Sequence, residues 1–204
     1  MEKSYASLLR EVESLQVKLT ELWHVAPVEV PGDCAGLLEL VAENHQRNFQ
    51  LWHEEDIARR DDLPLDRIKQ AKRAIDRFNQ ERNNFIERMD EFLVRTVQPS
   101  PAGPNCPQNS ETPGMIIDRL SILALKEYHM REETVREDVD DAHRGKCNEK
   151  LARIVLQRMD LVRCLTELMA DVVAQCRTFA VYYQFKMYND PALNPQLYQK
   201  AKSN

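Results

Sequence analysis

The stretch that decides the fold is residues 68–92, IKQAKRAIDRFNQERNNFIERMDEF. Its apolar residues recur at alternating intervals of three and four, which places them on one face of an α-helix. One member of that face is charged, because Arg82 stands between Phe78 and Phe85. A guanidinium is almost never buried without partners, since removing its water is costly. The pattern therefore predicts a long helix whose buried face carries a polar site, with a carboxylate or an anionic ligand opposite Arg82.

Amphipathic segments on both sides predict more helices. The expected helices cover residues 2–24, 34–60, 62–95, 112–144 and 148–187. Gly145 is typical of a residue that ends a helix, and the short links at 61–63 and 145–147 predict antiparallel hairpins. Only 5 of the 204 residues are glycine, which disfavours a sheet-rich fold with its many turns. We therefore expect an all-α fold, an elongated antiparallel bundle of about five helices, forming a single domain over residues 1–204.

Three segments of this domain are expected to differ from the central helices. Residues 1–32 form an N-terminal helix and a linker that contains Pro27 and Pro31. Residues 98–111 are rich in proline, which predicts an irregular loop. Residues 188–204 contain turn signals and form a C-terminal extension.

Composition excludes several classes of protein. The net charge is −5 and no basic stripe is visible, so we expect no nucleic-acid partner. No window of 18 apolar residues occurs, which predicts no membrane span. The five cysteines form no Cys-x-x-Cys pair, and the first residues show no apolar signal-peptide core. These features predict a reduced, cytoplasmic protein.

Other predicted helices also carry polar residues toward the centre. His45, Asn48 and Glu55 follow the three-four spacing of segment 34–60, and Asp118 lies in a segment that is apolar on nearly every side. Two interpretations stay open. The charges can form a buried ion-pair network that only fixes helix register, or they can form a ligand site.

In the second interpretation, three kinds of side chain form the ligand site. Cations neutralise phosphate or carboxylate oxygens, amides orient the ligand, and a tryptophan stacks on a ring. They are Arg82, Arg119 and Lys126; Asn48, Asn79 and Asn83; and Trp52, with Asp118 as a carboxylate partner. Arg82 is expected to be largely buried and paired with Glu55, Asp56 or Asp118, and Asn79 and Asn83 to line a pocket with Asn48. The acid–base candidates for any turnover are His45, Glu55 and Asp56.

Metal signatures are weak, so the sequence predicts no metal ligand and leaves the cofactor unknown. Glu21–His24 gives one Glu-x-x-His, but a di-metal bundle needs two. Glu87–Asp90 resembles half of the magnesium motif of all-α nucleotide pyrophosphatases, and the other half is missing because residues 54–56 are adjacent acids. A single-metal site from His45, His53, Glu55 and Asp56 is geometrically possible.

Four strings carry a family resemblance: NFQLWHEEDIAR at 48–59, KRAIDRFNQERN at 72–83, NSETPG at 109–114 continuing through IDRLSIL at 117–123, and QFKMYNDP at 184–191. Together they resemble the domain-of-unknown-function family numbered 4254, over about residues 35–198. The resemblance implies a cytoplasmic bacterial protein whose relatives are often encoded near glycosyltransferases of envelope polysaccharide synthesis. It implies no activity.

The leading hypothesis is that the polar pocket binds an anionic small molecule, such as a phosphorylated or nucleotide-linked sugar. The first alternative is a non-enzymatic adaptor for a glycosyltransferase, or a self-associating protein, whose polar cluster is purely structural. That alternative requires Arg82 and Asp118 to pair with no cavity beside them. The second alternative is a metal-dependent hydrolase similar to the all-α nucleotide pyrophosphatases.

Overall fold

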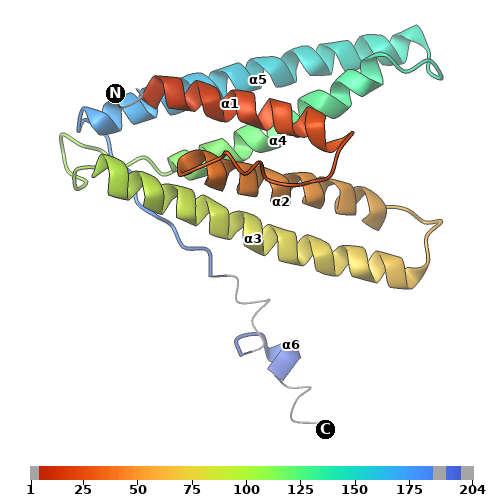
Figure 1. The fold of residues 1–204 in the computed structure, drawn as a ribbon, viewed down its shortest axis with the longest axis horizontal. Helices are drawn as coiled ribbons and strands as arrows, with labels where there is room; N and C mark the ends of the chain where they lie inside the picture. Colours follow the sequence, from red (N-terminus) through yellow and green to blue (C-terminus); the bar gives the residue numbers. More distant parts are fainter. Residues whose placement is uncertain (1–4, 186–191, 199–204) are drawn as a thin grey trace.

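The computed structural model describes residues 5–185 and 192–198, and these residues form helices with no strand (Figure 1). The helices are α1 (Tyr5–Trp23), α2 (Leu37–Ala58), α3 (Leu65–Val97), α4 (Pro113–Thr134), α5 (Asp141–Val173) and α6 (Pro195–Tyr198). Two isolated β-bridges, Gly103–Cys106 and Gln108–Thr178, are the only strand-like pairings in the described ranges. The predicted all-α bundle is confirmed.

Two helical hairpins form the body of the bundle. α2 packs along α3, and α4 packs along α5, while α1 lies against α2, α4 and α5 (Figure 1). α3 runs antiparallel to α2, as the short link after residue 60 predicts. None of the helices within the described ranges is both long and apolar enough to cross a membrane.

The core draws on one face of each of the five long helices. Val12, Val41, Met89, Ile117 and Met169 are each at most 1% exposed, and each comes from a different helix. On α3 the predicted apolar face is buried from Ala71 through Met89. α3 packs against α2 and α4, so Arg82 on this face lies next to the polar side chains of those two helices.

The boundary between the fourth and fifth helices differs from the prediction. α4 ends at Thr134 and α5 begins at Asp141, so Gly145 lies inside a helix and the expected break at 145–147 is wrong. Asp140 determines the start, because its carboxylate accepts a hydrogen bond from the His143 N–H at 2.7 Å. A capping side chain five residues before Gly145 therefore outweighs the helix-ending tendency of that one glycine.

The end of the fifth helix also differs. α5 ends at Val173, although no glycine or proline marks that point. Gln175 takes a left-handed conformation with φ 58°, and the Cys176 N–H donates to the Asp171 carbonyl at 2.9 Å. This is the Schellman pattern of hydrogen bonds at a helix end, in which the left-handed residue is usually glycine. The following segment runs back beside the proline-rich loop, where the Asn109 N–H donates to the Thr178 carbonyl at 2.7 Å.

The three flanking segments have different outcomes. Residues 98–111 are irregular apart from the two isolated β-bridges. α1 ends at Trp23, and irregular backbone connects it to α2. Most of the predicted C-terminal extension lies outside the described residues, which include only 192–198 of it.

Candidate functional site

A buried polar network is centred on Asp118 of α4, whose side chain is 3% exposed. Arg82 of α3 binds this carboxylate in a bidentate pair, with Nε to Oδ1 at 2.9 Å and Nη2 to Oδ2 at 2.8 Å. Paired N–H donors in a fixed fork match the geometry of a carboxylate. Of the three carboxylates predicted as possible partners of Arg82, the structure pairs it with Asp118, and the Arg82 side chain is 23% exposed.

Two amides complete the coordination of Asp118. Asn44 and Asn48 of α2 each donate from Nδ2 to Asp118 Oδ1 at 3.0 Å. Together with Arg82 they give Oδ1 three N–H donors, which offsets the loss of water around a buried carboxylate. Asn48 Nδ2 also contacts Ser121 Oγ at 2.9 Å. Asn48 therefore has a structural role as well as its predicted place in a pocket.

His45 extends the same network toward α1. The Thr20 hydroxyl donates to the Gln16 carbonyl at 2.8 Å, so its oxygen accepts from His45 Nε2 at 2.9 Å. His45 Nδ1 then accepts from the Ser121 hydroxyl at 2.7 Å. The ring is 0% exposed, and burial lowers its pKa to about 3. His45 is held neutral, with no nitrogen left to exchange a proton with a ligand, so the geometry does not favour its predicted acid–base role.

A cleft of about 320 Å³ opens beside the Arg82–Asp118 pair. It has an apolar wall and a polar rim, and its lining residues are Asn48, Leu51, Trp52, Glu55, Asp56, Arg59, Arg82, Ile122 and Leu125. Four of the predicted binding or catalytic residues of α2 and one of α3 thus share one surface. The adaptor hypothesis required no cavity here, so the presence of this cleft weakens it.

The charges around the cleft are largely paired. Arg59 Nη1 lies 2.7 Å from Glu55 Oε2, and Arg82 is bound to Asp118. Asp56 is exposed at the rim. The cleft therefore has no excess of positive charge, which an anionic ligand of high charge would require.

Arg119 and Lys126 do not join Arg82, so the predicted cluster of three cations is wrong. Both side chains are exposed, and Arg119 pairs with Glu111. They line a different groove between α4 and α5, together with Asp160. The reason is the helical turn of 100° per residue, which points Arg119 away from the face that carries Asp118.

Asn79 and Asn83 do not line the cleft either, so their predicted grouping with Asn48 is wrong. Both lie on α3 and are partly exposed. At 100° per residue they are rotated by about 60° and 100° from Arg82, both in the same direction. Arg82 points toward α4, where it binds Asp118.

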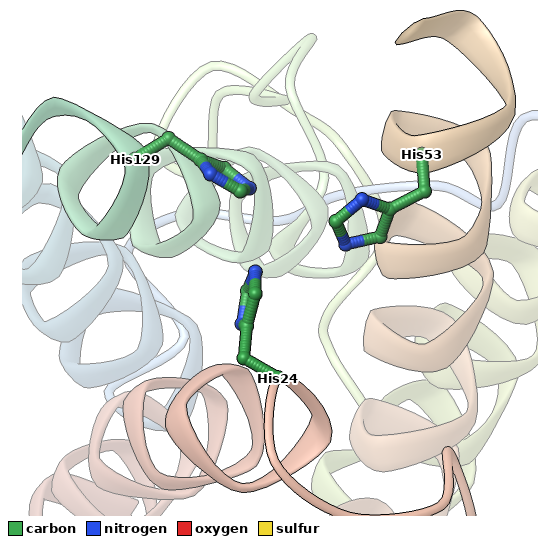
Figure 2. Close-up of side chains that lie close together, drawn as sticks. All are labelled: His24, His53 and His129. Carbon is green, nitrogen blue, oxygen red and sulfur yellow. The ribbon is translucent and has the colours of Figure 1, made fainter. Parts of the chain in front are cut away.

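A second polar group, which we call the histidine cluster, consists of His24, His53 and His129 (Figure 2). Their ring nitrogens lie within 4.8 Å of one another. Sequence reasoning missed this cluster and grouped His53 with His45 instead. His45 and His53 are eight residues apart on α2, about 12 Å along its axis. Since each member of the cluster comes from a different part of the chain, no local spacing reveals it.

The carboxylates of the hydrolase alternative are engaged elsewhere. Asp90 is 1% exposed and accepts from the Gly114 N–H at 2.7 Å, at the start of α4. Burial raises its pKa to about 6. Glu87 accepts from the Gln184 N–H at 2.7 Å, and Glu54 pairs with Arg67. Neither group of three or more metal-ligating side chains found in the described ranges contains any of these acids.

Gly114 shows why α3 and α4 approach closely at that point. A Cβ atom added there would lie 2.7 Å from the Ile86 carbonyl oxygen and 2.8 Å from Asp90 Oδ1. Only glycine leaves room for the backbone of α4 to receive the Asp90 carboxylate. This contact fixes the register between Arg82 and Asp118 further along the same helices.

Comparison with known proteins gives one result. No curated protein and no solved structure matches the chain. A family model described as a protein of unknown function, DUF4254, matches residues 38–181. The match covers most of the chain and includes the cleft, Asp118, His53 and His129, while α1 and His24 lie before it. The chain therefore belongs to the DUF4254 family.

Proposed function

We propose that the cleft beside Arg82 binds a small hydroxylated molecule of the sugar class, such as a phosphorylated or nucleotide-linked sugar used in bacterial envelope polysaccharide metabolism. The observation that carries the proposal is the combination of Trp52 with ion-paired carboxylates and guanidinium groups around one cleft. Small-molecule sites typically combine apolar walls with a few polar groups that fix orientation.

Each part of the cleft matches one feature of such a ligand. The indole of Trp52 offers a flat face on which the C–H side of a sugar ring can pack. Carboxylates such as Glu55 and Asp56 accept hydrogen bonds from hydroxyl groups. Leu51 and Ile122 keep water away from the ring.

The phosphate of the ligand is assigned to the two guanidinium groups. Arg82 uses two of its five N–H donors on Asp118, and Arg59 lies exposed at the rim. Because Arg119 and Lys126 lie elsewhere, we expect stacking and hydrogen bonds to contribute most of the affinity. A single phosphate fits this cleft better than a chain of several.

The competing proposal is an adaptor that docks on a glycosyltransferase. Its supporting observation is a pair of apolar side chains one turn apart on α5, Leu156 and Met159, each 60% exposed. An adaptor would act through that face, and changes in the cleft would leave its binding intact.

A thermal-shift screen tests the proposal, using sugars, sugar phosphates, nucleotide sugars and nucleotides. A ligand at a hundredfold its Kd stabilises the protein by about 2.7 kcal/mol. Glu55→Gln should weaken binding with little change in stability, since the Glu55–Arg59 pair is exposed. Asn83→Ala is the matched control on α3, outside the cleft, and should bind as the unmodified protein does. The proposal fails if no sugar-class compound stabilises the protein, or if Glu55→Gln and Asn83→Ala bind equally well.

A further inference from the structure

The histidine cluster brings three imidazoles from three helical segments to one point. His24 directly follows α1, His53 lies on α2 and His129 lies on α4. Figure 2 shows the three rings pointing from these helices into a common space. Convergence of this kind needs the tertiary fold, because no two members are close in sequence.

Two of the rings are oriented by hydrogen bonds on their far side. His24 Nδ1 lies 2.6 Å from the Thr20 carbonyl oxygen, and His129 Nδ1 lies 2.8 Å from Glu132 Oε2. A carbonyl and an ionised carboxylate only accept hydrogen bonds, so each Nδ1 carries the proton. In the neutral rings, Nε2 therefore presents a lone pair. Histidines that bind metals are oriented in this way, by a carbonyl or carboxylate on the other nitrogen.

These lone pairs lack a partner. Within the described ranges, five buried side-chain nitrogen or oxygen atoms have no hydrogen bond: Arg47 Nε, Glu127 Oε2, Arg158 Nε, His24 Nε2 and His129 Nε2. The first three form ion pairs, Arg47 with Glu81 and Arg158 with Glu127. The two that remain both belong to the histidine cluster. Buried acceptors are rarely left unmet in native proteins, so this pair calls for an occupant.

An aromatic shell holds the rings in place. Tyr128 stacks on His24 with ring centroids 3.9 Å apart, and Trp52 stacks on His129 at 4.9 Å with planes 9° apart. Phe49 meets the edges of His24 and His53 at 4.9 Å and 4.5 Å. The shell limits access of water and restricts rotation of the rings, which lowers the entropic cost of binding an ion.

We propose that His24, His53 and His129 bind one divalent transition-metal ion of the zinc class through their imidazole nitrogens, with a fourth position left for water or a ligand atom. Three neutral nitrogens suit Zn²⁺, Co²⁺, Ni²⁺ and Cu²⁺ better than Mg²⁺ or Ca²⁺, which prefer oxygen. Zinc–nitrogen bonds of about 2.0 Å in a tetrahedron place the ligand atoms about 3.3 Å apart. The imidazoles must therefore close in by up to about 1.5 Å, which side-chain rotation provides.

A bound proton accounts for the cluster less well. One proton can satisfy at most two of the three converging nitrogens. A divalent ion is the occupant that all three lone pairs can bind at once.

Metal titration of the whole chain tests this proposal, after stripping with a chelator and its removal by dialysis. Co²⁺ should bind one ion per chain with the intense visible absorption of a low-coordinate site, and Zn²⁺ should displace it. The proposal requires no sugar ligand, so its outcome is separate from that of the cleft. Absence of the Co²⁺ spectrum together with absence of Zn²⁺ heat in calorimetry would overturn it.

Variants assign the ion to the cluster. His53→Ala and His129→Phe should each reduce Zn²⁺ affinity at least 100-fold, since each removes a ligand. Glu132→Gln should reduce it about 10- to 100-fold by weakening the bond that orients His129. Glu137→Gln, at another exposed acid nearby in sequence, should bind as the unmodified chain does.

A further control separates this cluster from the second group of metal-ligating side chains. That group, Glu133, His143 and Cys147, lies where α4 joins α5. His143→Ala should leave the Co²⁺ spectrum unchanged. If His143→Ala abolishes the spectrum, or if His53→Ala and Glu132→Gln retain full affinity, the assignment is wrong. Melting curves without metal show whether each variant is folded. If a histidine variant does not fold, Glu132→Gln still tests the proposal, because it leaves all three imidazoles in place.

Discussion

The Asp118 network and the histidine cluster are both buried polar groups, and both include residues from α2 and α4, yet they differ in how their members meet one another. Asp118 accepts three N–H donors on one oxygen and one on the other. In the histidine cluster, two buried nitrogens have no donor at all. Buried polarity alone therefore does not identify a site. Unmet lone pairs that converge on one point are the stronger sign of a ligand.

Removing Asp118, the centre of the Asp118 network, should have the largest effect on stability. Asp118→Ala leaves Arg82, Asn44 and Asn48 without their shared acceptor, so we expect a loss of about 3–5 kcal/mol of unfolding free energy. Urea unfolding measures it. Asp160→Ala is the control, because Asp160 and Arg163 are 58% and 64% exposed, and it should cost less than about 1 kcal/mol. Similar losses in the two variants would mean that the network is not dry.

Binding of a metal ion to the histidine cluster should have the next largest effect on stability. Zn²⁺ at a hundredfold its Kd should raise the unfolding free energy by about 2.7 kcal/mol, and a chelator should reverse the change. The shift is read from melting curves with and without the ion. His53→Ala should remove the shift, whereas Glu55→Gln in the cleft should keep it.

Acid should destabilise the fold through His45 of the Asp118 network. Its folded pKa of about 3 lies below the unfolded value of about 6.5, so the unfolded chain binds the proton first. The stabilisation is complete above about pH 6.5 and falls by about 1.4 kcal/mol per pH unit below it, which is about 2 kcal/mol by pH 5. The unfolding free energy, measured as a function of pH, should fall more steeply below about pH 6.5 in the unmodified protein than in His45→Gln. Parallel curves would show that His45 titrates normally.

The smallest effect on stability is expected when His129, and with it an unmet nitrogen lone pair, is removed in the absence of metal. His129→Phe keeps an aromatic ring for Trp52 and eliminates an unmet buried nitrogen, losing only a bond to exposed Glu132. We expect a change of less than about 1 kcal/mol in chelator, by urea unfolding. A loss as large as that of Asp118→Ala would mean that His129 is already satisfied within the fold.

The sequence predicted features that depend on one helix or on a strong electrostatic requirement. The face from Ala71 to Met89 follows from local periodicity, and the need for a carboxylate partner, which the sequence leaves open among Glu55, Asp56 and Asp118, follows from the cost of burying the charge of Arg82. The prediction failed for Arg119, because its neighbours in sequence are mostly apolar although its own side chain points outward from the helix. It failed for Asn79 and Asn83 because the direction in which α4 lies is a tertiary property.

Helix ends were predicted less well than helix faces. Gly145 and Asp140 compete as boundary signals, and their relative strength depends on the capping bond that forms in the folded chain. Gln175 occupies a conformation usually reserved for glycine, so its identity gives no warning. The histidine cluster could not be predicted at all from spacing, since it requires the relative placement of α1, α2 and α4.

Trp52 forms a common wall between the two proposed sites. Its side chain lines the cleft, and its ring stacks on His129. A molecule that shifts the indole therefore shifts a metal ligand, so binding at one site changes affinity at the other. Thermodynamic reciprocity makes the two changes equal, and couplings of about 1–3 kcal/mol correspond to about 5- to 150-fold in either affinity. The metal content of a preparation would then set the apparent affinity of the cleft.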